Sequence, residues 1–204
     1  MLSAEKIQKD YDIGLISHSE YEQMMKTANP TWNGESVGNT TAVSTPVTED
    51  NVLDQFDVKK DPIDAVTWYH HNDYLPLKFN CINVYIGEKF NSAQPWLRLD
   101  IDYEGLGWLF VKSITVVADG QRFDKTDMDF SKTDVSGEDV FEFSDSTVTS
   151  DDFKMLEAVA SAKTATLRVR GERGNMDFDI SESDRIAIRD ALMLYKKLGG
   201  TEPP

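Results

Sequence analysis

Cysteine is almost absent from the chain, which has one, Cys81, among 204 residues. A single cysteine excludes an internal disulfide, and with it the small disulfide-rich domains of secreted proteins. Cys81 lies in an apolar, alternating run. We expect a buried and inert thiol there, because reactive thiols need a basic and accessible setting.

Basic residues are also few. The chain has 21 Lys and Arg against 36 Asp and Glu, a net charge of −15. Acidic residues occur in nearly every segment, so the charge belongs to the whole surface rather than to one tail. Such a surface repels phosphate groups. The sequence therefore predicts no binding to nucleic acids or to anionic membranes.

Long apolar runs are missing. No stretch approaches the ~18 apolar residues of a membrane-spanning helix, so we expect no transmembrane segment. The first residues, MLSAEKIQKDYDIG, lack the basic head, apolar core and small-residue cleavage site of a signal peptide. The sequence as given predicts a cytoplasmic location, unless a signal or a lipid anchor has been removed from it.

The residue patterns of common enzymes are missing as well. His70 and His71 are neighbours, so on a strand their side chains point to opposite faces, and His18 is distant in sequence. The nucleophile motif G-x-S-x-G does not occur, and the glycine pairs at 105–107 and 171–174 lack the lysine of a phosphate-binding loop. We predict no catalytic residue and no cofactor, which favours a protein that is not an enzyme.

One acidic segment has the spacing of a calcium-binding loop. Oxygen-bearing side chains occupy positions 1, 3, 5, 7 and 12 of such a loop: Asp127, Asp129, Ser131, Thr133 and Glu138. Lys132 stands where the loop needs a glycine, and the spacing arises easily by chance in so acidic a chain. A solvated polar loop over residues 125–137 is the default interpretation, and an enzyme that uses acidic residues with a divalent metal is an alternative one.

Residues 65–200 carry the pattern of an α+β domain. Apolar or alternating stretches predict strands at residues 66–70, 77–86, 96–103, 108–118, 121–124, 139–144, 164–170 and 175–180. Helices are predicted over residues 149–162 and 181–198, each with a Ser or Thr cap and an apolar face. This order predicts an antiparallel β-sheet with two packing helices.

Trp96–Ala118 is the most apolar stretch, and we expect it to form the central hairpin of that sheet. Its first half alternates, with Leu97, Leu99, Ile101 and Tyr103 on one face and Arg98, Asp100 and Asp102 on the other, as in a half-solvated strand. Asp119-Gly120 then predicts a tight turn into the next strand.

Arg168 and Arg170 fall on one face of a predicted strand. They are expected to pair with Asp177 and Asp179 across a hairpin, and an anion site is the alternative. On the strand at 139–144, Val140 or Phe141, together with Phe143, is expected to point inward.

Residues 1–27 predict a short helical hairpin, with Gly14 ending the first helix and Ser17 and Glu20 forming a capping box for the second. The stretch IQKDYDIGLISHSEYEQMMK resembles the bacterial helical-hairpin motif called SHOCT. The matching residues are Asp12, Gly14, Leu15, Ile16, Ser17, Glu20, Tyr21 and Lys26. That motif usually closes a chain, whereas here it opens one. The resemblance implies a tethering or assembly module. A generic capped helix pair is the alternative.

Residues 28–64 are interpreted as a flexible linker. Residues 28–50 are rich in Thr, Ser, Asn, Gly and Pro and show no periodicity. Residues 51–64 carry Val52, Leu53 and Phe56 at helical spacing and are expected to form at most one or two helical turns.

The main domain is similar to one that recurs in bacterial and prophage-encoded proteins and lipoproteins. The similarity rests on GWLFVKSITVVADGQRF, EFSDS, DDFKMLEAVASAKTATLRVRG and FDISESDRIAIRDALMLY, in this order. It supports the fold and implies no activity.

These features favour a non-enzymatic assembly protein of bacterial or phage origin. In this interpretation the sheet domain recognises a protein partner, and the hairpin mediates tethering or self-association. A phage accessory protein that interferes with a host is a further alternative. The residues expected to contact partners are Tyr11, Ile16, Tyr21, Trp32, Trp68 and Tyr69.

Overall fold

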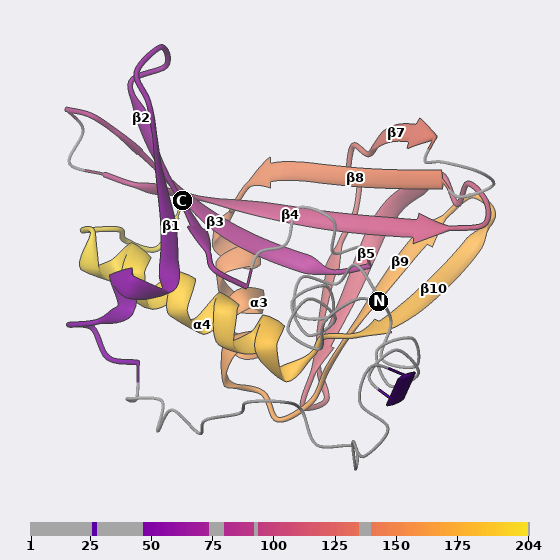
Figure 1. Cartoon of the computed structure of the whole chain (residues 1–204). Helices are drawn as coiled ribbons and strands as arrows, with labels where there is room; N and C mark the ends of the chain where they lie inside the picture. The colour runs from indigo at the N-terminus through magenta and orange to yellow at the C-terminus, as the bar shows by residue number, and fades with distance from the viewer. Residues whose placement is uncertain (1–25, 28–46, 74–79, 92–93, 135–139, 204) are drawn as a thin grey trace. The chain divides into compact units, whose positions relative to one another are not determined.

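Figure 1 shows a computed structural model of the chain, which describes residues 26–27, 47–73, 80–91, 94–134 and 140–203. The chain divides into two units after Pro46, and every strand and helix named below belongs to the second unit, Val47–Pro204. The predicted helical hairpin lies outside the described residues apart from Lys26 and Thr27, as do residues 28–46 of the predicted linker.

The described part of the second unit is built from two antiparallel sheets and two α-helices (Figure 1). Sheet A has the strand order β1 (Phe56–Asp61), β2 (Val66–His71), β3 (Ile82–Lys89), β4 (Trp96–Gly105), β8 (Val140–Thr147) and β7 (Ser131–Asp134). Sheet B has the order β10 (Gly174–Asp179), β9 (Ala165–Gly171), β5 (Val111–Ala118) and β6 (Gln121–Lys125). The helices are α3 (Ser150–Ser161) and α4 (Glu182–Lys197), and a 3-10 turn, η1 (Val52–Gln55), precedes β1. The predicted α+β class, with antiparallel strands and two helices, is confirmed.

The central hairpin predicted over Trp96–Ala118 is wrong, because its two halves belong to different sheets. β4 pairs with β3 and β8, whereas β5 pairs with β6 and β9. Residues 106–110 carry the chain from one sheet to the other, and Phe110 has a φ of 55° there. A left-handed backbone at a bulky residue redirects the chain where a hairpin would have continued it.

Two segments predicted as irregular are strands. Residues 56–61 of the predicted linker form β1, which pairs along its whole length with β2 at the edge of sheet A. Charged residues on an edge strand face water and prevent edge-to-edge aggregation. Lys59 and Lys60 interrupt the apolar pattern from which a strand is predicted, so the sequence does not indicate β1. Within the predicted polar loop, residues 131–134 form β7, which pairs with β8.

The core lies between the inner faces of the two sheets and the helices. α4 packs on β2 and β3 of sheet A, and α3 packs between α4 and β5 of sheet B. Ile188, Ala191, Leu192 and Tyr195 form the buried face of α4, as the helical spacing predicts. Both helices begin with capping boxes, in which a hydroxyl and a carboxylate satisfy backbone N–H groups reciprocally.

The hairpins of sheet B follow the prediction. Asp119 (φ 45°) and Gly120 (φ 88°) form the tight turn between β5 and β6. The Asp119 carboxylate also accepts the backbone N–H groups of Lys163 and Thr164, which join α3 to β9. Arg168 pairs with Asp177 across the β9–β10 hairpin, so the cross-strand pairing is confirmed at this position.

Candidate functional site

The candidate site is the face of sheet A that points away from the core, here called the outer face. On β4, Leu97, Leu99, Ile101 and Tyr103 are buried in the core, so the residues between them point to the outer face. Its central residues come from four adjacent strands and the residue before β3: Trp68, His70, Cys81, Asn83, Tyr85, Trp96, Arg98, Asp100, Asp102, Phe143, Asp145 and Thr147.

Aromatic rings cover one end of the outer face. The Trp68 ring lies 5.6 Å from the rings of both Trp96 and Tyr85, and His70 stacks on Tyr85 at 4.7 Å. Gly87 lies beneath the two indoles, and a Cβ there would come within 2.4 Å of Trp96 and 2.8 Å of Trp68. The absence of a side chain at position 87 therefore lets both rings lie against the sheet. All four rings are half-buried.

An ion pair occupies the middle of the outer face. Asp145 accepts hydrogen bonds from the Tyr85 hydroxyl at 2.6 Å and from Arg98 Nε at 3.0 Å. Arg98 also donates to the Thr147 hydroxyl at 3.1 Å. Burial and the hydrogen bond to Asp145 raise the pKa of Tyr85, so this hydroxyl stays protonated. The network holds these side chains in one geometry.

Two carboxylates occupy the other end. Asp100 and Asp102 are each only 9% exposed. Burial, and then the charge of Asp100, raise the pKa of Asp102 from 3.8 to about 7. The contact that opposes this rise is a 3.7 Å hydrogen bond from the Cys81 thiol. Asp102 stands opposite Phe143 of β8, and Phe143 stacks on Phe141 at 5.3 Å.

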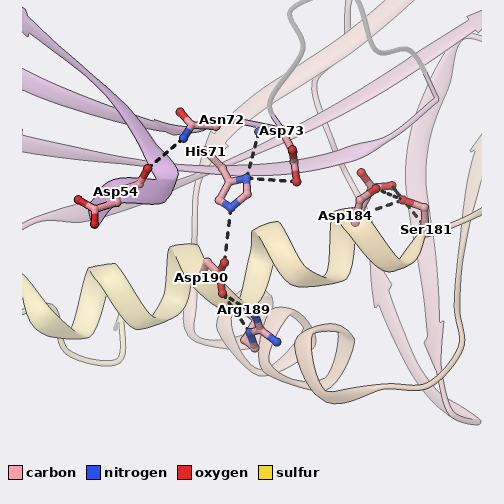
Figure 2. A network of polar contacts seen from close by, with 9 residues as sticks. Asp54, His71, Asn72, Asp73, Ser181, Asp184, Arg189 and Asp190 are labelled. Carbon is pink, nitrogen blue, oxygen red and sulfur yellow. Dashed lines mark hydrogen bonds and ion pairs between the residues drawn. The ribbon is translucent and has the colours of Figure 1, made fainter. Parts of the chain in front are cut away.

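A second polar cluster is buried on the inner side of sheet A, where β2 meets α4 (Figure 2). His71 Nε2 lies 3.5 Å from Asp190 Oδ2, and Arg189 donates to Asp190 Oδ1. His71 Nδ1 accepts the backbone N–H of Asp73 at 3.1 Å. Burial works to raise the pKa of Asp190, but the contacts with His71 and Arg189 outweigh it and hold that pKa below its ordinary value.

This cluster resembles a catalytic Asp–His pair but lacks its working nitrogen. In a general base one imidazole nitrogen faces the carboxylate and the other faces the substrate. Here the second nitrogen of His71 faces the main chain of Asp73, and the ring packs edge-on against Phe56 at 5.2 Å. The geometry therefore serves to fasten α4 to the end of β2.

A third carboxylate joins the two sheets. Glu142 of β8 is 0% exposed, and its two oxygens accept the backbone N–H groups of Leu109, Phe110 and Val111 at 2.7, 2.9 and 2.8 Å. Consecutive N–H groups that converge in this way form an anion-binding nest. The nest is filled by the protein's own side chain, so it supports the fold rather than a ligand.

The structure describes some of the predicted site residues and not others. Trp68 lies on the outer face, whereas the ring of Tyr69 is buried in the core and its hydroxyl donates to Glu88 at 2.7 Å. Tyr11, Ile16, Tyr21 and Trp32 lie outside the described residues. His70 and His71 point to opposite faces of sheet A, as predicted.

The calcium-loop interpretation does not fit the backbone. Ser131 and Thr133 belong to the extended strand β7, which pairs with β8, so these positions cannot curl around an ion as positions 5 and 7 of a calcium loop do. Glu138 lies outside the described residues. Among the residues that the structure does describe, no three His, Cys, Asp or Glu side chains come together as a metal site.

The alternation of β4 predicts Arg98, Asp100 and Asp102 on one face, but as solvated side chains, whereas Asp100 and Asp102 are buried. Tyr85, Phe143 and Asp145 were not predicted as their neighbours. The alternation of β4 was the available signal. The neighbours depend on the pairing of β4 with β3 and β8, which no local pattern specifies.

Searches against protein-family models, curated proteins and solved structures find no match for this chain. In the described ranges, no helix has both the length and the apolar character needed to cross a bilayer.

Proposed function

We propose that the protein is a non-enzymatic binding protein whose outer face of sheet A recognises a protein partner. The observation that carries this proposal is the half-exposed set of Trp68, Tyr85 and Trp96 beside the ordered Arg98–Asp145 pair. Tryptophan, tyrosine and arginine dominate the energetic centres of protein interfaces, where rigid aromatic rings give contact area at a small entropic cost.

The use made of the buried ionisable groups supports the same conclusion. Both nitrogens of His71 face groups of the protein itself, and the Glu142 carboxylate accepts hydrogen bonds from three backbone N–H groups. Neither of these two groups is free to exchange a proton with a substrate. No observation in the described part favours the metal-dependent alternative.

Residues 1–27 are assigned the tethering or self-association role that the SHOCT resemblance implies, and the bacterial or phage origin rests on the same kind of resemblance. Sedimentation of the full chain against residues 47–204 tests this part. The second unit holds all the core residues named above, so it should remain folded. We expect the full chain to form oligomers and residues 47–204 to remain monomeric. Equal sedimentation of the two at all concentrations would remove the self-association role.

The binding role of the outer face is tested by site-specific crosslinking. A photoreactive amino acid replaces Tyr85 in one variant and Val117 in the other. Val117 is 37% exposed on sheet B, away from the core, and serves as the matched control. We expect a partner from a bacterial extract to crosslink at position 85 alone.

The crosslinked protein is then purified and its affinity is measured directly. Trp68→Ala should weaken its binding by about 30-fold, the effect of removing an aromatic anchor worth ~2 kcal/mol. Equal crosslinking at both positions, or an affinity that Trp68→Ala leaves unchanged, would contradict the proposal.

A further inference from the structure

We propose that the outer face takes an extended basic segment of its partner, with Lys or Arg side chains at alternate positions placed against Asp100, Asp102 and Phe143. The inference rests on the proposed function and deepens it. It assigns a chemistry to the partner and a docking position at the acidic end of the outer face.

The first support is an incompletely compensated carboxylate. Within the described residues, the hydrogen bond that Asp102 receives comes from the Cys81 thiol at 3.7 Å, and a thiol is a weak donor. The guanidinium of Arg98, on the same face of β4, is directed to Asp145 and Thr147. A carboxylate that is 91% buried and lacks a strong donor would be stabilised by an added cation.

The second support is the aromatic lining. Phe143 stands directly across from Asp102 in the strand pairing, and the Phe141 ring stacks on it. A cation between a carboxylate and an aromatic ring gains both a charge-assisted hydrogen bond and a cation–π contact. An inorganic cation is the weaker alternative, because the described residues contain no group of three metal-ligating side chains.

The third support is the spacing along β4. Asp100 and Asp102 are two residues apart on one strand, so their side chains project from the same face roughly 7 Å apart. Side chains at alternate positions of an extended peptide have the same separation. The charge also suits a basic segment, because the chain has a net charge of −15.

The titration of Asp102 supplies an independent signature. The charged and titratable groups around it are Asp100 and Arg98 on its own strand, Tyr85 on β3, Asp145 on β8, and the Cys81 thiol just before β3. Because its pKa is about 7, this carboxyl is close to half-protonated at neutral pH. A cation bound beside it should expel that proton.

The test uses the full chain and two peptides of equal composition. One is a short threonine peptide with two arginines at alternate positions, and the other has the two arginines adjacent. By calorimetry at pH 7 and low salt, we expect the alternating peptide to bind about tenfold more tightly than its isomer. Titrations in buffers of different ionisation enthalpy should show proton release of up to about half a proton per complex.

Asp102→Asn should weaken the alternating peptide by about tenfold and abolish the proton release. Asp151→Asn is the matched control, because it removes the same charge from a side chain that is 97% exposed on α3. A melting curve shows that each variant is folded. Equal loss in both variants, equal affinity of the two peptides, or no measurable binding at millimolar peptide would overturn the inference.

The two proposals fail separately. If the partner found by crosslinking depends on Trp68 but is indifferent to Asp102→Asn, the outer face is a binding surface and the basic-segment inference is wrong. If Trp68→Ala has no effect on that partner while the peptide results hold, the proposed role of the aromatic end is wrong instead.

Discussion

Replacing Glu142 by Gln tests how the two sheets are joined. The side chain keeps its size, and its remaining carbonyl oxygen can still accept the N–H groups of Leu109 and Phe110. The new NH2 group, however, faces the N–H of Val111, which Glu142 Oε2 accepts at 2.8 Å. The hydrogen bond from Val111 is therefore replaced by a contact between two donors. The hydrogen bonds from Leu109 and Phe110 no longer go to a charged group.

The expected cost follows from these changes. A hydrogen bond to a charged group contributes ~1.5–3 kcal/mol, and a buried unsatisfied donor costs ~1–3 kcal/mol. We expect Glu142→Gln to lower the free energy of unfolding by about 3 kcal/mol, from a total that is usually ~5–15 kcal/mol. For a domain of this size the melting temperature should fall by roughly 6–12 °C. Glu142→Ala, which frees all three N–H groups, should cost more.

Urea unfolding followed by tryptophan fluorescence and circular dichroism measures this difference. Glu157→Gln is the control, because Glu157 is 45% exposed on α3, where it pairs with Lys196. Its loss should change stability by less than ~1 kcal/mol. If Glu142→Gln lies within 1 kcal/mol of the wild type in the same assay, the nest does not hold the sheets together and the reasoning is refuted.

Three further predictions concern the outer face and the α4 anchor. Gly87→Ala places a methyl group 2.4 Å from Trp96, so it should displace the indoles, destabilise the protein by ~1–3 kcal/mol and change the tryptophan emission; an unchanged emission spectrum would argue against the packing described. The pKa of Asp102 is raised from 3.8 to about 7, so the folded protein keeps a proton that the unfolded chain releases, and this carboxyl's contribution to stability falls as pH rises from about 4 to 7. At ~1.4 kcal/mol per pKa unit the fall is ~4 kcal/mol at most. Asp102→Asn should therefore gain stability relative to the wild type between pH 5 and pH 8 in urea titrations, and parallel pH profiles would contradict the shift. Asp190→Asn breaks the buried pair with His71 and should cost ~3 kcal/mol, with hydrogen exchange in α4 rising first; unchanged exchange would show that this pair does not anchor the helix.

Local chemistry accounts for the parts of the fold that the sequence predicts. The caps of α3 and α4, the Asp119-Gly120 turn and the Arg168–Asp177 pair each depend on residues close together in the chain. The alternation of β4 also identifies its core face, since strand periodicity is a property of the strand itself.

The parts that could not be predicted depend on distant residues. Glu142 was not expected in the core, because the favourable partners of its carboxylate are N–H groups of residues 109–111, more than thirty positions earlier. Phe143 was expected to face inward, and it lies on the outer face because Glu142 and Ser144 point to the other side. The outer face could not be predicted for the same reason. It joins side chains of four strands, and the order of those strands depends on pairing between distant residues.

The two sheets draw their strands from interleaved parts of the chain, and this has a consequence for synthesis on the ribosome. Four strands of sheet A come first, but β8 and β7 follow only after β5 and β6 of sheet B have been made. β5 cannot complete its pairing until β9 has been made, since Val116 pairs with Leu167. A nascent chain that ends before residue 165 thus exposes one whole edge of β5, with Ile114 and Val116 ready to join the wrong strand. Pairings over such distances fold slowly, so we expect the newly made protein to be open to mispairing at this stage for longer than a domain built from consecutive hairpins.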